Sequence, residues 1–352
     1  MTLNSTVELK GSENITEVTN STLKQHQVTW TQFSLTLFTC VVGCLSNGTV
    51  IWVLGFRMKK GGFFTYVLNL AVADFAFCAM YATEIPIFLD QSNYPYGVWG
   101  CRLDTYFTRL FVYASTILIA CICFERCLAI RYPMWYKYRR PQWVPAVTCI
   151  AAWVFAATIL IVYPASLIIT TRPGSPRKCR IRSETALLFI AFSELTTIFL
   201  LPLCVIITCH GIIIHRMVRE DRNGARRSKV NLTVCATTTL FLLCWTPFQG
   251  ATCLSIVNIL FFKKNESLNA IYLSISSYSS VLVYLNSCLN PFVYLLLGRD
   301  MKKRIIVSLP CLQGVLERAF TDLQDLNETL ITPFQQIDIP PLIELIGKKL
   351  EW

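Results

Sequence analysis

The sequence predicts an all-α membrane protein, a seven-transmembrane helix bundle with a short amphipathic cytoplasmic helix. Composition is the first reason: 54% of the 352 residues are hydrophobic and 15% are charged, whereas a soluble domain carries roughly a quarter charged residues. The second reason is that apolar runs near the length of a bilayer span, about 20 residues, recur along the chain. These runs predict spans at residues 31–56, 64–89, 102–130, 143–169, 185–214, 230–261 and 269–297.

Basic residues follow the odd-numbered spans, beginning with Arg57 and Lys59 after the first and Arg139 and Arg140 after the third. By the positive-inside rule these segments face the cytoplasm, which puts the N-terminus outside the cell and the protein in the plasma membrane. Three N-glycosylation sequons agree with that orientation, at Asn4, Asn14 and Asn20. The net charge of +11 then reflects membrane topology, and we expect no nucleic-acid partner. The basic outer loop after the fourth span is an exception that topology does not explain.

The chain divides into four predicted parts: an extracellular glycosylated tail (1–30), the seven-transmembrane domain (31–297), an amphipathic membrane-surface helix (298–320) and a cytoplasmic tail (321–352). The polar first part has no cleavable signal peptide, so we expect the first span to direct insertion. The third part mixes basic and apolar residues, a pattern that favours contact with anionic membrane lipids. Within it, Cys311 is either a palmitoylation site or an unmodified buried thiol.

The cytoplasmic tail carries few hydroxyl residues, so a dense phosphorylated signal for arrestin is not favoured, although arrestin stays open as a partner. Residues 337–352 are more apolar than a usual disordered tail, and composition offers no physical reason for this.

The chain contains sixteen cysteines. We interpret most of them as small apolar side chains that pack within the spans. Two differ, because Cys101 lies at the outer start of the third span and Cys179 lies in the second outer loop. Both face an oxidising compartment, so we predict a disulfide that ties this loop to the third span. Since the sequence contains no Cys-x-x-Cys pair and no histidine cluster, it does not suggest a protein-bound transition metal.

An ionisable residue inside a membrane span is by default a functional candidate, and Asp74 lies in the middle of the second span. Small polar residues lie at comparable depth in other spans: Asn47, Ser115, Asn286 and Asn290. A carboxylate surrounded by hydroxyl and amide oxygens suits a small hard cation such as sodium, or it takes up a proton. A purely structural carboxylate is the remaining alternative.

Prolines interrupt the last three spans. They are Pro202 in the fifth span, Pro247 shortly after Trp245 in the sixth, and Pro291 in the Asn290-Pro291-x-x-Tyr294 sequence of the seventh. Proline removes a backbone donor and clashes with the preceding turn, and in hydrocarbon that loss must be repaired by other groups. We therefore predict bending points that let the cytoplasmic halves of these helices tilt.

In their order along the chain, these features resemble those of the rhodopsin-like (class A) G protein-coupled receptors, over about residues 31–310. The matching residues are Asn47, Asp74, Cys101 with Cys179, Glu125-Arg126-Cys127, Trp153, Pro202, Cys244-Trp245-Thr246-Pro247 and Asn290-Pro291-x-x-Tyr294. The resemblance implies that Arg126 is the cytoplasmic switch that contacts a heterotrimeric G protein, with Glu125 as its ion-pair partner and Tyr294 as its water-linked partner. Cys127 replaces the more usual tyrosine of that triplet.

The same resemblance implies a sodium pocket formed by Asp74, Ser115, Asn286 and Asn290, with sodium as an allosteric ion and no other cofactor. It also implies that Trp245 is a toggle beneath the ligand. In the expected mechanism, the sixth span swings outward at Pro247 when an agonist binds.

A narrower resemblance is to the Mas-related receptors. It rests on segment 52–60, on Glu125-Arg126-Cys127-Leu128 with the following segment 132–141, and on Leu316-Glu317-Arg318-Ala319-Phe320. Two features depart from that subfamily, which usually lacks the third-span disulfide and the tryptophan of Cys-Trp-x-Pro. Its ligand-binding acids are therefore not carried over.

The outer halves of the spans should form the ligand pocket. Thr108 stands where aminergic receptors place an aspartate and Tyr284 where opsins place the retinal lysine, which argues against an amine receptor and a light receptor. The charged candidates are Glu84, Asp104, Arg109 and Glu194. Glu84 and Glu194 suggest a cationic ligand, unless Arg109 pairs with one of them. Phe248, Tyr278 and Tyr284 could line the walls of the pocket, although ordinary helix packing explains each of them equally well.

We therefore predict a receptor for an extracellular peptide or cationic small molecule, with a heterotrimeric G protein as intracellular partner. The basic outer loop leaves an acidic ligand open. A non-signalling decoy receptor is the first alternative, and a membrane transporter is a weaker one because the chain lacks internal repeats. No nucleophile–base pair is visible in the sequence, so we do not predict an enzyme.

Overall fold

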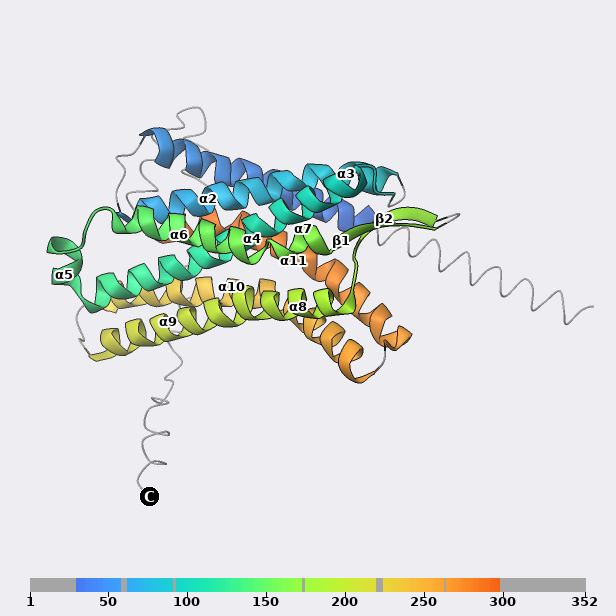
Figure 1. Cartoon of the computed structure of the whole chain (residues 1–352). Helices are drawn as coiled ribbons and strands as arrows, with labels where there is room; N and C mark the ends of the chain where they lie inside the picture. Colours follow the sequence, from blue (N-terminus) through green and yellow to red (C-terminus); the bar gives the residue numbers. More distant parts are fainter. Residues whose placement is uncertain are drawn as a thin grey trace, which may run out of the picture. The chain divides into compact units, whose positions relative to one another are not determined.

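A computed structural model describes residues 30–57, 62–90, 93–172, 175–219, 224–262 and 264–297. This part of the chain contains seven helices that are long and apolar enough to cross a membrane, which confirms the predicted fold class (Figure 1). The sequons at Asn4, Asn14 and Asn20, the segment 298–320 with Cys311, and the tail 321–352 lie outside the described residues. So do the side chains of residues 217–238 and 293–297.

The first three spans are continuous helical segments joined by short connections. The first span is Trp30–Arg57, which ends in the π-helical segment η1 (Val53–Arg57). The elements that follow are α2 (Gly62–Met80), η2 (Tyr81–Thr83), α3 (Glu84–Leu89), α4 (Gly97–Arg131) and α5 (Pro133–Tyr138). Helix α4 ends two residues before Pro133, because a proline disfavours helical backbone at the residue before it. Pro133 instead opens α5, where its missing N–H is not needed.

The second half of the bundle includes the outer hairpin and the last four spans. Its elements are α6 (Val144–Ile159), α7 (Val162–Ser166), β1 (Leu167–Arg172), β2 (Ser175–Ile181), α8 (Glu184–Glu194), η3 (Leu195–Leu200), α9 (Leu201–Arg219), α10 (Gly224–Phe261) and α11 (Glu266–Leu297). Strands β1 and β2 pair antiparallel, and Ile169 lies opposite Cys179.

Two side chains cap helices at the outer end of the bundle. The Ser183 hydroxyl accepts a hydrogen bond of 3.2 Å from the backbone N–H of Ala186 and begins α8. The Asn265 side chain accepts bonds from the N–H groups of Ser267 and Leu268, at 2.9 and 3.2 Å, and begins α11. Such caps satisfy backbone donors that have no partner inside the helix, and they fix where both spans start.

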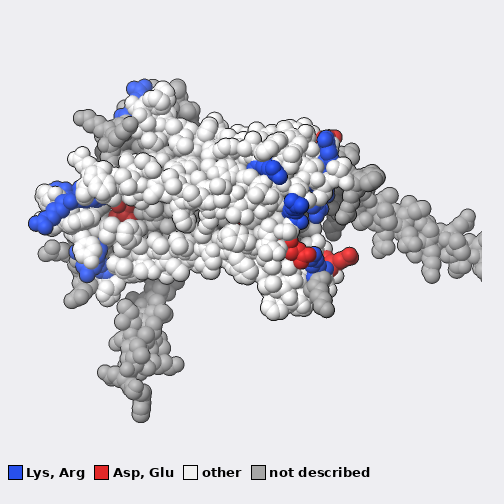
Figure 2. Space-filling model, viewed as in Figure 1, with Lys and Arg blue, Asp and Glu red and all other residues white. Residues whose placement is uncertain are grey.

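The interior of the bundle is packed by side chains from most of the spans. Its centre contains Phe77 of α2, Tyr113 of α4, Ile198 of η3, and Phe241 and Trp245 of α10. The outward faces carry exposed apolar side chains, as expected for helices in contact with lipid. In Figure 2, Lys and Arg side chains gather towards the two ends of the visible face, and the belt between them is almost uncharged.

The predicted spans agree with the helices, with three shifts. The predicted fourth span ran to residue 169, but residues 167–169 belong to β1, because the Leu-Ile-Ile run is as compatible with a strand as with a helix. Helix α4 begins at Gly97, where a positive φ of 67° suits a glycine, and not at residue 102. Helix α10 begins at Gly224, before the predicted residue 230, since a helix can continue beyond its apolar stretch.

Candidate functional site

The outer hairpin is fastened to the third span. Cys179 of β2 and Cys101 of α4 form the predicted disulfide, with their Cα atoms 5.8 Å apart. The backbone N–H of Tyr94 donates to the carbonyl of Arg177 at 2.9 Å, and Arg102 Nε donates to the carbonyl of Leu167 at 3.4 Å. The hairpin is therefore held at the outer start of α4 by a covalent bond and by hydrogen bonds.

Arg109 and Glu194 neutralise each other in the outer half of the bundle. Arg109 Nη1 of α4 lies 2.7 Å from Glu194 Oε1 of α8, and the Glu194 side chain is only 7% exposed. Tyr163 of α7 also donates a hydrogen bond to this carboxylate. The pairing that the sequence left open for Arg109 is thus present, and Glu194 does not offer a free charge to a cationic ligand.

The other two outer acids lack such a partner. Asp104 of α4 accepts a hydrogen bond of 2.6 Å from the Thr83 hydroxyl, at the end of η2. Glu84 opens α3 and is exposed, and it lies close enough to Asp104 for their charges to repel. Among the described residues, no lysine or arginine forms an ion pair with either carboxylate. Negative charge at this place is therefore available to a ligand.

Two of the uncharged ligand candidates, Tyr284 and Phe248, pack against neighbouring aromatic rings. Tyr284 stacks on Phe77 with ring centroids 4.5 Å apart, and its edge meets Tyr81. Phe248 packs edge-on against Trp245, with centroids 6.5 Å apart. Thr108 is half-buried in α4. Their positions neither require nor exclude a contact with a ligand.

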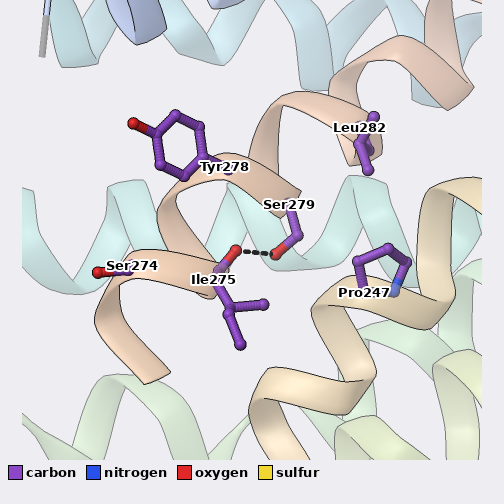
Figure 3. Close-up of a pocket in the computed structure, with 6 residues that line it drawn as sticks. All are labelled: Pro247, Ser274, Ile275, Tyr278, Ser279 and Leu282. Carbon is purple, nitrogen blue, oxygen red and sulfur yellow. Dashed lines mark hydrogen bonds between the residues drawn. The ribbon is translucent and has the colours of Figure 1, made fainter. Parts of the chain in front are cut away.

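A separate groove of about 440 Å³ lies between the outer halves of α10 and α11 (Figure 3). Its lining is mostly apolar and consists of Pro247, Ser274, Ile275, Tyr278, Ser279 and Leu282. The Ser279 hydroxyl points back to its own helix and donates to the carbonyl of Ile275 at 2.6 Å. Of the candidate ligand residues, only Tyr278 lines this groove.

The middle of the bundle contains a hydrogen-bonded carboxylate. Asp74 is fully buried and accepts one bond from the Ser115 hydroxyl at 2.6 Å and one from the Asn290 amide at 2.8 Å. Asn286 is also buried, at 3% exposure. The structure thus brings together three spans at Asp74. A hard cation such as sodium takes oxygen ligands, so the Asp74 carboxylate and the Ser115 hydroxyl fit that ion.

Asn47 repairs the gap that Pro291 leaves in the seventh span. Because Pro291 has no N–H, the carbonyl of Ser287 one turn earlier lacks its helical donor. Asn47 Nδ2 donates to that carbonyl at 3.1 Å and to the carbonyl of Gly43 at 3.0 Å. The side-chain oxygen of Asn47 is buried without a hydrogen-bond partner among the described residues. A side chain from the first span therefore supports the kink.

The other two prolines also lie inside spans. Pro202 directly follows Leu201, where the π-helical segment η3 changes to α9, so the wider turn lies where the helix loses a donor. Pro247 lies inside α10. Trp245, one turn below Phe248, is 3% exposed, and its indole N–H has no partner among the described residues.

At the cytoplasmic end, Glu125 is bound by the second inner loop. Arg140 Nη2 lies 2.5 Å from Glu125 Oε1, and the two side chains are 8% and 4% exposed. The Tyr136 hydroxyl of α5 donates to the same oxygen at 2.7 Å and accepts a bond of 3.1 Å from Arg140. Burial and the bond to Glu125 raise the pKa of Tyr136 to about 12, so this hydroxyl stays a donor.

Arg126 does not form the ion pair with Glu125 that the resemblance implied. Its guanidinium carbon lies 3.6 Å from the ring centroid of Phe63 in α2, and its Nε has no hydrogen-bond partner among the described residues. The expectation is corrected because Arg126, the next residue along the helix, points in a different direction from Glu125 and lies against Phe63. Arg140 and Tyr136 bind the Glu125 carboxylate instead. The side chain of Tyr294 lies outside the described part of the chain.

Sequence reasoning missed Tyr136, Arg140 and Tyr163 as partners of buried acids. A signal existed for the first two, because Tyr136 and Arg140 are four residues apart in a loop that follows Glu125 closely. No local signal links Tyr163 to Glu194, which is 31 residues away.

Residues 46–294 match the family described as 7 transmembrane receptor (rhodopsin family). The chain is 30% identical to formyl peptide receptor 2 of Mus musculus, over 98% of this chain and 99% of that protein. It is 31% identical to N-formyl peptide receptor 3 of Homo sapiens, over 91% and 93%, and 30% identical to the human fMet-Leu-Phe receptor, over 84% and 85%.

These relatives are formyl peptide receptors, so the similarity is not specific to the Mas-related subfamily. With seven spans in the described residues and a family match that covers most of the chain, the protein is a multi-pass protein of the plasma membrane and not an enzyme. The chain belongs to the rhodopsin family and is a class A G protein-coupled receptor.

Proposed function

We propose that this receptor binds an extracellular peptide and responds by activating a heterotrimeric G protein. One observation carries the proposal: the relatives that align with nearly the whole chain bear the names of receptors for formylated peptides. The outer half of the bundle is compatible with it, because Glu84 is exposed and Asp104 is half-buried, while Arg109 and Glu194 form an ion pair with each other.

At the cytoplasmic end, Arg126 is the residue that we expect to contact the G protein. It is half-buried at the end of the third span and outside any ion pair with the described acids. An outward movement of the cytoplasmic half of α10 about Pro247 would open a cleft beside it. The ligand drives this movement only through a higher affinity for the open state.

Asp74, Ser115, Asn286 and Asn290 are the residues that would hold a sodium ion. When bound, the ion would supply positive charge that lets Asp74 remain ionised inside the bundle. Without it, Asp74 keeps its two hydrogen bonds to Ser115 and Asn290, and uptake of a proton is the alternative means of removing its charge. In both cases a change at Asp74 in α2 also affects α4 and α11, because Ser115 and Asn290 are hydrogen-bonded to it.

The narrower Mas-related placement stays a proposal that rests on the inner-loop motifs around Glu125-Arg126-Cys127-Leu128. A response restricted to N-formylated peptides would count against it and would place the receptor functionally with the relatives above. A response to unblocked peptides would favour it.

The test is G protein activation in cells that express the chain, measured for several Gα subtypes against a mixed peptide library. We expect activation that disappears when the library is first digested with a protease, and no activation in cells without the receptor. Activation only by small molecules or acidic lipids, with surface expression confirmed, would contradict the peptide assignment.

A further inference from the structure

The outer acids Glu84 and Asp104 occupy a space inside the bundle and not on its lipid face. Glu84 is near Asp104 of α4 and also near Tyr284 of α11 and Tyr81 of η2, close enough for electrostatic interaction with each. It is nevertheless exposed, and Asp104 is half-buried. The two carboxylates therefore lie between spans, in a place that solvent and a ligand can reach.

A buried hydroxyl lies close to the same two carboxylates. Tyr94 is only 6% exposed, yet its hydroxyl has no hydrogen-bond partner among the described residues. Burial, followed by the nearby charges of Asp104 and Glu84, raises the pKa of Tyr94 above its ordinary value. A Cβ atom at Gly100 would lie 3.9 Å from this hydroxyl, and Gly100 is one helical turn from Asp104 on the same face of α4.

A hydroxyl this buried usually finds a partner, because leaving a polar group unpaired away from water costs free energy. Two carboxylates at close range repel each other, and a bound cation, like the uptake of a proton, relieves that repulsion. Three arginines at this end are engaged elsewhere: Arg102 with the Leu167 carbonyl, Arg109 with Glu194, and Arg177 with Asn93. In the part of the chain that the structure describes, no lysine or arginine forms an ion pair with Glu84 or Asp104, so a cationic group of a ligand can supply the counter-charge.

Resting on the peptide function proposed above, we propose that Glu84, Asp104 and the Tyr94 hydroxyl form a subsite for a primary ammonium group of the ligand. An ammonium has three donors, and the subsite offers one acceptor group for each of them. The group is either the free N-terminus of the peptide or a lysine side chain. A formylated N-terminus carries no charge and would not fill this subsite, so this receptor would differ from its named relatives in ligand choice.

Three peptide libraries separate the two sources of the ammonium group. The first has free N-termini and no lysine, the second is N-formylated with no lysine, and the third is N-formylated with one lysine. We expect the second library to be at least about tenfold less potent in G protein activation than the better of the other two libraries. This difference corresponds to a loss of about 1.4 kcal/mol of binding free energy for the second library. Equal potency of all three would overturn the subsite.

Variants of the receptor test the named residues. Glu84→Gln and Asp104→Asn should each lower the potency of the preferred library at least tenfold and remove the preference over the second library. Tyr94→Phe should lower it about threefold, as for one hydrogen bond. Glu184→Gln is the matched control, because Glu184 is an exposed outer acid already paired with Lys264. Surface expression is measured for each, and retained preference in both acid variants would overturn the assignment.

A second measurement needs no peptide. Thermal unfolding of the purified full-length receptor is followed with n-pentylamine and with its uncharged analogue N-pentylacetamide, each at about 10 mM, because such small ligands bind in the millimolar range. We expect the amine alone to raise the unfolding temperature by roughly 2 °C, and to have no effect on the Glu84→Gln/Asp104→Asn double variant.

The two measurements fail separately. Stabilisation by the amine without any response to peptides would refute the peptide function and leave the ammonium subsite standing. A peptide response without amine stabilisation and without ammonium preference would refute the subsite and leave the peptide function standing.

Discussion

The contact between Glu125 and Arg140 yields the sharpest test of the cytoplasmic geometry. The ion pair is 2.5 Å long, and both side chains are less than a tenth exposed, at 8% for Arg140 and 4% for Glu125. At that distance and an effective dielectric constant of about 20, the attraction is about 7 kcal/mol. The cost of removing two charges from water cancels much of this, which leaves a net coupling of about 2–3 kcal/mol.

The perturbation is a double-mutant cycle with Glu125→Gln and Arg140→Met, measured as thermal unfolding of the purified full-length receptor. We expect each single variant to lower the unfolding temperature, and the double variant to lower it by less than the sum. At roughly 2 °C per kcal/mol, the coupling corresponds to about 4–6 °C. A parallel cycle with Glu125→Gln and Arg126→Met should give a coupling below about 1 kcal/mol, because Arg126 rests on Phe63.

Gly62 provides an independent check on the same contact. A Cβ atom at Gly62 would lie 2.6 Å from Arg140 Nη1, so Gly62→Ala must displace the guanidinium. In the Gly62→Ala background the Glu125–Arg140 coupling should shrink. If the larger coupling belongs to Arg126, or if Gly62→Ala leaves the Arg140 coupling unchanged, the geometry described for Glu125 is wrong.

Three further predictions concern other parts of the bundle. Asp74→Asn should remove the effect of sodium on agonist affinity in radioligand binding while preserving surface expression, and an unchanged sodium dependence would contradict the pocket. Arg109→Met leaves Glu194 buried with only Tyr163 as a partner, so it should destabilise the receptor by about 3 kcal/mol, whereas Arg109→Met with Glu194→Gln should recover most of that loss. Cys101→Ser should lower the free energy of unfolding by about 2–4 kcal/mol, because it opens a loop with a sequence separation of 78; unfolding equal to that of the wild type under oxidising conditions would contradict a structural role.

The spans and the disulfide could be predicted from the sequence because each depends on a local property. Hydropathy over some twenty residues fixes which segments enter the membrane, and the outer positions of Cys101 and Cys179 fix their redox environment. The polar centre at Asp74 was also predictable, since few groups in a span can satisfy a carboxylate. Its neighbours Ser115 and Asn290 are indeed bonded to it in the structure.

The pairing of buried charges could not be predicted in the same way. Glu125 had an adjacent arginine in the sequence, yet adjacent residues on a helix point in different directions, and Arg140 reaches the acid from the loop instead. Tyr163 meets Glu194 only because the fold brings the end of α8 close to α7. The Tyr94 hydroxyl is likewise buried without a partner among the described residues because the outer hairpin packs against the start of α4. These are tertiary contacts, and a single sequence does not encode them locally.

The central claim is that this rhodopsin-family receptor converts peptide binding into G protein activation through Arg126. The most direct measurement is nucleotide exchange on purified G protein by the purified receptor, with the best peptide library, for the wild type and for Arg126→Ala. We predict peptide-dependent exchange by the wild type and loss of exchange in Arg126→Ala, with peptide binding retained. Equal exchange by both proteins, or exchange that no peptide alters, would contradict the account.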